Sequence, residues 1–510
     1  MSNIVLSTLN ARYIHSSLGL RYLQANMGEL SSKTQLLEFI INNRPIDIVE
    51  GLLTQNPSII GFGVYIWNVA ETTQVVSLLK TIQPDITIVL GGPEVSFEQE
   101  QQKIVELADY VITGQADLAF AELCTNILNN NPGDEKIIKA NPVPLPFLNM
   151  PYEYYTDEDI KNRVIYVEAS RGCPFKCEFC LSSLDKTAWP FDLDLFLTEM
   201  DKLYQRGVRD FKFIDRTFNL KIQSSIKILA FFLAKADKNL YLHFELIPDH
   251  LPEKLKSVLE KFPEGSLQFE IGIQTFDPDV QTRISRKQNN NKSKENIRWL
   301  RQKTHAHLHT DIIMGLPGES INSIASSFNQ LIELEPHEIQ MGILKRLRGT
   351  PLIRHTAEFD MRYNPEAPYN ILSTSLIDFQ TMQRLSRFAR FWDMIANSGR
   401  FNYTLPVILA DDGFDRFLTL SDALFQASKQ THKIALARLF DLLFQVITEH
   451  LEIEVEIARQ VLWLDYQTSG LKGQPVFANS DMIKQQRAKV FKAKSDMPSR
   501  QARHAKKLLS

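Results

Sequence analysis

Cysteine is scarce in this sequence, which contains only four cysteines among 510 residues. That scarcity argues against the disulfide framework of a small secreted domain. No apolar run reaches the ~18 residues that a membrane-spanning helix needs, and the first residues lack the charged-then-apolar pattern of a secretory signal. Neither sign of charge dominates, since the formal net charge is −3. We therefore predict a cytoplasmic protein without a membrane segment.

Two nucleotide-binding signatures are also missing. No G-x4-G-K-(S/T) run occurs, and Gly61-Phe-Gly63 lacks the third glycine of a dinucleotide fingerprint. A hydrophobic content of 44% is ordinary for a globular protein. At this length one hydrophobic core is insufficient, so we expect two or three domains.

What the sequence does contain is a cysteine-rich loop, Arg171-Gly-Cys-Pro-Phe-Lys-Cys-Glu-Phe-Cys180. Cys173, Cys177 and Cys180 have C-x3-C-x2-C spacing. Three thiolates can hold three irons of a [4Fe–4S] cube, which leaves the fourth iron open to a small molecule. A structural zinc site needs four closed ligands, and this loop has neither a histidine nor a second cysteine pair nearby. The spacing predicts an iron–sulfur cluster with one open position.

This spacing, with Phe179 before the third cysteine, resembles the signature of radical S-adenosylmethionine (SAM) enzymes. The resemblance implies a partial TIM barrel with the cluster on the loop after its first strand. Residues 164–168 alternate and are β-branched, which predicts a strand directly before the loop. The resemblance further implies that SAM binds the open iron. One electron, from a donor such as a flavodoxin or ferredoxin, then yields a 5′-deoxyadenosyl radical.

Four downstream segments (211–219, 241–247, 268–274 and 309–319) are predicted to be barrel strands with polar ends. Two of them resemble family segments: E-x-G-x-Q at 270–274, and D-x-I-x-G-L-P-G-E at 311–319. Residues at the carboxyl ends of barrel strands face the active site. The candidate catalytic residues are Asp215, Arg216 and Asn219, and the candidate SAM contacts are Phe179, Glu245, Glu270, Gly272 and Gln274.

The segment before the cysteines alternates short apolar strands with helical stretches, which predicts a parallel sheet covered by helices. Ligands of such sheets bind over the carboxyl ends of the strands. We expect strands at 3–9, 35–41, 59–66, 86–90 and 110–113, and helices at 71–81 and 98–108, among others.

An α/β domain in this position resembles the cobalamin-binding module of B12-dependent radical SAM proteins. Gly91-Gly-Pro-Glu94 matches the turn after the module's fourth strand, and Thr113-Gly-Gln-Ala-Asp117 stands where the class has G-E-G-E. The D-x-H-x2-G motif, whose histidine ligates cobalt in other B12 proteins, is absent, so we predict no histidine on cobalt. The alternative is a domain that kept the fold but lost cobalamin. We expect cobalamin to lie between this domain and the barrel. Its candidate contacts are Asn10, Trp67, Gly91, Gly92, Pro93 and Gly114.

The predicted fold class is α/β with a mostly α-helical C-terminal region. We expect a Rossmann-like cobalamin-binding domain at 1–130, a linker at 131–160, a partial barrel at 161–350 and a helical domain with a basic tail at 351–510. The last region resembles the uncharacterised DUF4080-type domain that follows some B12-type radical SAM proteins. Arg346, Arg348 and the 363–369 loop either close over the barrel or form an ordinary surface loop.

The reaction implied by the resemblance is methylation of an unactivated carbon. The radical would abstract hydrogen from the substrate, methylcobalamin would deliver the methyl group, and a second SAM would regenerate methylcobalamin. Two alternatives stay open. One is a cobalamin-dependent rearrangement or cyclisation without methyl transfer, and the other is modification of RNA or protein. Only the basic run at 500–507 suggests a nucleic-acid partner, and a solvated helix end is the commoner interpretation. The substrate and oligomeric state are not predicted.

Overall fold

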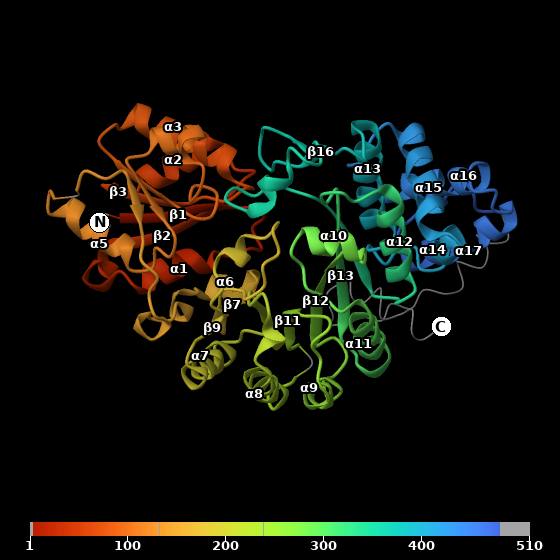
Figure 1. Ribbon diagram of the computed structural model, residues 1–510, viewed down its shortest axis with the longest axis horizontal. Helices are drawn as coiled ribbons and strands as arrows, with labels where there is room; N and C mark the ends of the chain where they lie inside the picture. The colour runs from red at the N-terminus through yellow and green to blue at the C-terminus, as the bar shows by residue number, and fades with distance from the viewer. Residues whose placement is uncertain (1–3, 132, 238, 480–510) are drawn as a thin grey trace.

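The computed structural model describes residues 4–131, 133–237 and 239–479 (Figure 1). Three units follow one another along the chain: an α/β domain in red and orange, an open barrel in yellow and green, and a group of helices in blue. No described helix combines the length and apolar character of a bilayer span. The basic run at 500–507 lies outside the described residues.

The N-terminal sheet is parallel throughout, with strand order β2-β1-β3-β4-β5-β6. All seven residues of β1 are buried, because helices cover both faces of the sheet. The five predicted strands are present, although β3 ends before residue 66. The sixth, β6, lies within the predicted linker and pairs with β5 as a short edge strand. The strands are β1 (Ile4–Asn10), β2 (Thr34–Ile40), β3 (Ile59–Gly63), β4 (Thr87–Gly91), β5 (Tyr110–Thr113) and β6 (Ile137–Lys139).

Five helices pack on this sheet. The helix predicted at 71–81 is confirmed within α3. The helix predicted at 98–108 is shorter than expected, because Glu98 has a left-handed φ of 53° and a 3₁₀ turn separates it from α4. The helices are α1 (Leu18–Ala25), α2 (Pro45–Leu53), α3 (Val69–Ile82), α4 (Lys103–Leu107) and α5 (Ala119–Leu128).

The second sheet is a six-stranded partial barrel, also parallel, in the order β14-β13-β12-β11-β10-β7. The strand predicted at 211–219 ends early, at Phe213, and a turn and a 3₁₀ helix follow. The last strand, β14, was not among the predicted ones. The strands are β7 (Ile165–Val167), β10 (Asp210–Phe213), β11 (Tyr241–Leu246), β12 (Leu267–Gln274), β13 (His307–Met314) and β14 (Glu338–Ile343).

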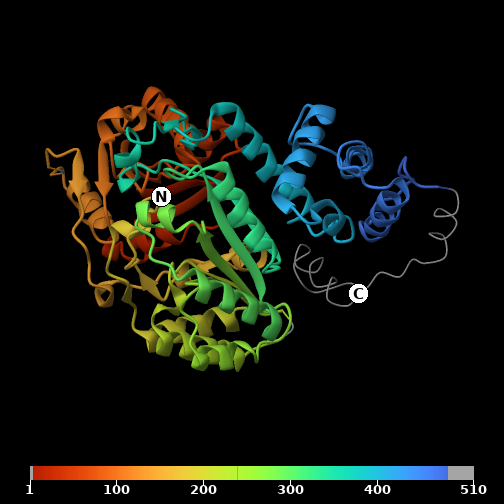
Figure 2. The ribbon, with the colours of Figure 1, turned by 45° about the vertical axis from the view of Figure 1, so that its right-hand side comes forward.

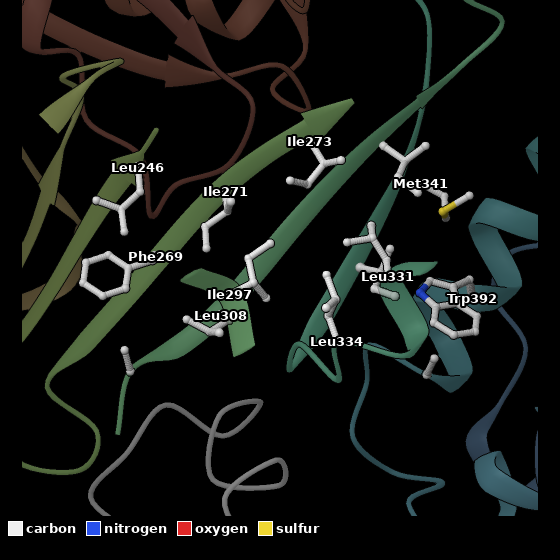
Figure 3. Close-up of a cluster of buried hydrophobic side chains, with 14 of the residues drawn as sticks. Leu246, Phe269, Ile271, Ile273, Ile297, Leu308, Leu331, Leu334, Met341 and Trp392 are labelled. Carbon is white, nitrogen blue, oxygen red and sulfur yellow. The ribbon is translucent and has the colours of Figure 1, made fainter. Parts of the chain in front are cut away.

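Alternation along β12 separates the packing face of the barrel from its interior. Phe269, Ile271 and Ile273 are buried in the core that also includes Ile297 and Leu308, and Figure 3 shows these side chains along the strand. The alternate residues face the barrel interior, as the two-residue period of a strand requires. The covering helices are α7 (Leu193–Gln205), α8 (Ile222–Leu233), α9 (Glu253–Leu259), α11 (Asn290–Lys303) and α12 (Ile321–Ile332).

The C-terminal region is helical, as predicted, after a short hairpin of β15 (Arg362–Tyr363) and β16 (Ile371–Ser373). Its core continues that of the barrel: Phe328 of α12 packs against Phe388, Trp392 and Phe414. Figure 2 shows these helices beyond α12. They are α13 (Phe379–Ile395), α14 (Thr404–Leu409), α15 (Gly413–Ser428), α16 (Leu436–Glu449) and α17 (Val455–Thr468).

Candidate active site

The three clustered cysteines line one cavity of about 290 Å³ at the carboxyl end of the barrel. Their loop is closed where β8 (Ser170–Arg171) pairs with β9 (Trp189–Pro190). Cys173 and Cys177 are buried and Cys180 is partly exposed. In the part of the chain that is described, no three His, Cys, Asp or Glu side chains gather as ligands of a single ion would. Because a cube takes its thiolates on three separate irons, three thiols around one cavity fit a [4Fe–4S] cluster.

The candidate SAM residues line the same cavity: Phe179, Glu245, Glu270, Gly272 and Gln274, together with the candidate catalytic residue Arg216. The Gln274 side chain packs closely on Gly272, since a Cβ atom there would lie 2.5 Å from Nε2 of Gln274. A bulge follows Gly272, and Gln274 has a left-handed φ of 69°. Such bulges re-aim side chains beside active sites. This cradle fits a polar cofactor next to the cysteines.

Charges in the cavity are paired across neighbouring strands. Arg216 Nη1 lies 2.8 Å from a carboxylate oxygen of Glu245. Burial would raise the pKa of Glu270, but the contact with His243 (3.0 Å) and the charge of Lys212 outweigh it and hold the pKa at about 2. Glu270 is therefore anionic at neutral pH. Fixed groups of both signs suit a zwitterionic amino-acid moiety such as that of SAM.

Two of the candidate catalytic residues do not line the cavity, which corrects their predicted placement. Asp215 is buried beneath the start of the cysteine loop, where it accepts hydrogen bonds from the Ala169 amide (2.9 Å) and the Ser170 hydroxyl (2.6 Å). Burial raises its pKa to about 7. Asn219 donates to the carbonyl of Ile247 (2.9 Å) and accepts from its amide (2.8 Å). Both residues hold loops around the cavity.

Four charged residues that line the cavity were not predicted as site residues: Asp249, Arg286, Lys287 and Asp311. Arg286 Nη1 lies 3.7 Å from Sγ of Cys177, and Arg286 also donates to the carbonyl of Gly272. Asp311 lies at the far wall, where burial and the charges of Glu270 and Glu245 raise its pKa. Asp311 stood in the D-x-I-x-G-L-P-G-E run, so that motif could have indicated it. Arg286 follows a short helix and carried no sequence signal.

Two adjoining cavities lie over the carboxyl ends of the N-terminal strands and share Gly19 and Tyr65. The first, about 210 Å³, is lined by three predicted cobalamin contacts, Gly91, Gly92 and Gly114. The second, about 390 Å³, is lined by Asn10 and Trp67.

Residues of both domains line this second cavity, because Tyr166 and Ile214 come from the barrel side. Trp67 is 46% exposed and stacks on Tyr65 with ring centroids 4.4 Å apart. Pro93, predicted as a contact, lines neither cavity. A flat indole face beside the β1–β3 switch point, with glycine-rich turns after β4 and β5, fits a large, flat cofactor.

Known family models match each of the three units of the chain. Residues 4–124 match the B12 binding domain, 167–331 the radical SAM superfamily and 357–508 a protein family of unknown function, DUF4080. The chain thus carries a radical SAM domain, with a B12-binding domain before it and a DUF4080 domain after it. These families define the cofactors as a [4Fe–4S] cluster, SAM and cobalamin, and the class needs a reductant.

The relatives of this chain are distant in sequence. An uncharacterized methyltransferase of Pyrococcus horikoshii is 26% identical over 41% of this chain and 51% of its own length. The cobalamin-dependent radical SAM methyltransferase TokK of Streptomyces tokunonensis is 24% identical over 58% of this chain and 48% of its own. The chain thus spans about half the length of these relatives. The radical SAM methyltransferase TsrM of Kitasatospora setae, solved with cobalamin and a [4Fe–4S] cluster, has a similar fold, with a TM-score of 0.55, 17% identity and coverage of 70% of this chain and 75% of that one.

Proposed function

We propose that this protein is a cobalamin-dependent radical SAM methyltransferase that methylates an unactivated carbon. One observation carries the proposal: the cysteine-lined cavity and the interdomain cavity lie on either side of one short turn after β10. Ile214 lines the interdomain cavity, and Arg216, two residues later, lines the cysteine cavity. A substrate held near this turn would have access to both cofactors. The similarity to the radical SAM methyltransferases TokK and TsrM supports the same assignment.

The chain's own residues have separate roles in this proposal. Cys173, Cys177 and Cys180 ligate the cluster, and the Arg216–Glu245 pair and Glu270 hold the charged groups of SAM. Asn10, Trp67, Gly91, Gly92 and Gly114 surround cobalamin. When bound, the cluster and SAM would supply the radical and cobalamin would supply the methyl group.

The proposal includes the setting in which the enzyme works. A cluster that cleaves SAM needs a one-electron donor, and a flavodoxin or ferredoxin has the required chemistry. A reducing cytoplasm is the expected location, because the described cysteines are free thiols.

The first experiment is anaerobic reconstitution followed by quantitation of iron, sulfide and cobalamin. We expect about four irons and one cobalamin per chain, and release of 5′-deoxyadenosine when SAM and a reductant are added. Cys177→Ala should abolish that release. Cys124→Ala is the matched control, because Cys124 is buried in α5; it should retain both the cluster and the activity. Retained activity in Cys177→Ala would contradict the ligand assignment.

Product analysis with candidate substrates separates methylation from the alternatives. Methyl transfer adds ~14 mass units to the product, whereas rearrangement gives an isomer and cyclisation a dehydrogenated product. If the cobalamin-loaded enzyme gives an isomeric product, the methyl-transfer proposal is wrong and the rearrangement hypothesis holds.

A further inference from the structure

Residues 346–369 leave the last barrel strand and enter the DUF4080 domain, and they contact both cofactor-binding regions. We call residues 346–369 the bridging segment. Figures 1 and 2 both show the cyan chain around β16 lying against the orange N-terminal domain. The contacts of this segment converge on two carboxylates far apart in sequence, Glu94 and Glu178.

At one end, the bridging segment holds the turn after β4. Glu94 is 4% exposed and accepts hydrogen bonds from the Tyr369 hydroxyl (2.6 Å) and Arg348 Nε (2.9 Å). Arg346 forms a two-pronged pair with Glu98 (2.9 and 2.8 Å). Glu94 follows the Gly91–Gly92 turn by two residues, so these bonds fix the part of the N-terminal domain that lines the first cobalamin cavity.

Steric contact reinforces this end. The ring of Phe97 lies against the backbone of Gly349, where an added Cβ atom would come within 2.3 Å of the ring. The Arg348 guanidinium also lies over the Tyr369 ring, 4.9 Å from its centroid. The turn and the bridging segment therefore form one packed unit, in which the buried ion pair is also hydrogen-bonded.

At the other end, the same segment holds the cysteine loop. Glu178 stands between Cys177 and Cys180 and is buried. His355 Nε2 lies 2.8 Å from one of its carboxylate oxygens, and Arg354 donates to the other. The amide of Leu352 donates to the Glu178 carbonyl (3.1 Å). The loop that carries the cluster ligands is thus anchored to the bridging segment by side-chain and backbone bonds.

We propose that the bridging segment sets the position of the cobalamin turn relative to the cluster loop, with Arg348, Tyr369 and His355 as positioning residues. This gives the junction of barrel and DUF4080 domain a role in assembling the two-cofactor site. The inference rests on the proposed function only in that cobalamin is the ligand of the first cavity. The two ends predict separable effects: loss of the Glu94 contacts should affect cobalamin, and loss of the Glu178 contacts should affect the cluster.

The test uses the full chain and two readouts that do not depend on turnover. Hydroxocobalamin binding is titrated by absorbance, and amide hydrogen exchange is followed in residues 92–102. Arg348→Ala should weaken binding at least about tenfold, as loss of a buried hydrogen-bonded charge does, and should accelerate exchange in 92–102. The milder variants Arg348→Lys and Tyr369→Phe cover the case in which Arg348→Ala does not fold. They should give smaller changes in the same direction.

His355→Gln tests the other end. It should alter the electron paramagnetic resonance spectrum of the reduced cluster and leave hydroxocobalamin affinity unchanged. Arg384→Ala is the control, because Arg384 pairs with Asp422 inside the helical domain, away from the bridging segment; it should change none of these readouts. Wild-type affinity and exchange in Arg348→Lys and Tyr369→Phe would overturn the inference. Absence of cobalamin binding by the wild-type protein would instead overturn the proposed function, and the exchange rates would still decide the positioning role.

Discussion

Arg171 and Asp117 face each other across the boundary between the N-terminal domain and the barrel, with two parallel contacts of 3.0 Å each. Arg171 also donates to Glu168 (2.8 Å) and lies over the ring of Tyr22, 4.3 Å from its centroid. It stands two residues before Cys173. A single guanidinium therefore connects the start of the cluster loop to the domain expected to hold cobalamin, and all of its partners are largely buried.

Replacing this guanidinium should destabilise the protein strongly. Arg171→Ala leaves two buried carboxylates unpaired, and breaking a buried pair in this way costs about 3 kcal/mol or more. We expect a lower urea midpoint, measured by circular dichroism. The control is Arg44→Ala, since Arg44 pairs with Asp47 at the exposed surface, where such pairs contribute little. An Arg171→Ala midpoint equal to that of Arg44→Ala would show that the interdomain pair does not support the fold.

Gly92 provides a test that separates steric contact from backbone strain. It has a left-handed φ of 108°, and a Cβ atom on it would lie 2.5 Å from the carbonyl oxygen of Val64. Gly207 has nearly the same φ, 104°, but open space around its Cβ position. Gly92→Ala should lose hydroxocobalamin binding, because the turn must move away from β3. Gly207→Ala should bind hydroxocobalamin normally and lose only about 1–3 kcal/mol of folding stability through backbone strain. Equal cobalamin affinity of the two variants would argue against a tightly fitted turn.

Much of this fold follows from local patterns. Strands such as β1, whose residues are mostly apolar, predict a sheet covered on both faces, and the cysteine spacing locates the cluster loop. The placement of Asp215 and Asn219 could not be predicted, because it depends on tertiary contacts. Phe218 stacks on Phe244 at 3.9 Å between centroids, which turns the chain back after β10 and directs Asp215 and Asn219 into loop backbones.

Contacts between residues far apart in the sequence could not be predicted from the sequence either. The bridging-segment partners of Glu94 and Glu178 lie more than 170 residues away in the chain. Arg346 and Arg348, predicted either to close over the barrel or to lie in a surface loop, in fact bind the N-terminal domain. Side-chain charge alone does not identify such partners, because every Asp or Glu of the chain is an equivalent candidate in the sequence.

The buried Asp215 carboxyl predicts a pH dependence of stability. Burial raises its folded-state pKa to about 7, against an ordinary value of 3.8. Folding therefore takes up a proton between these pH values, and the contribution of Asp215 to stability falls as pH rises from about 4 to about 7. Asp215→Asn removes this titration. The urea midpoint of the variant, relative to wild type, should rise between pH 5 and pH 8, and a constant difference would show that Asp215 is already ionised in the folded protein.

Arg286 should tune the cluster electrostatically, since its guanidinium lies 3.7 Å from the Cys177 sulfur. Adding an electron increases the negative charge of the cluster, so a nearby cation favours the reduced state. Arg286→Gln should lower the midpoint potential, measured by redox titration with paramagnetic resonance detection. Lys287→Gln is the matched control: Lys287 lines the same cavity and carries the same charge, but the structure shows no contact between it and a cysteine sulfur among the described residues. It should shift the potential less, and equal shifts in the two variants would assign the effect to the net charge of the cavity and not to the contact with Cys177.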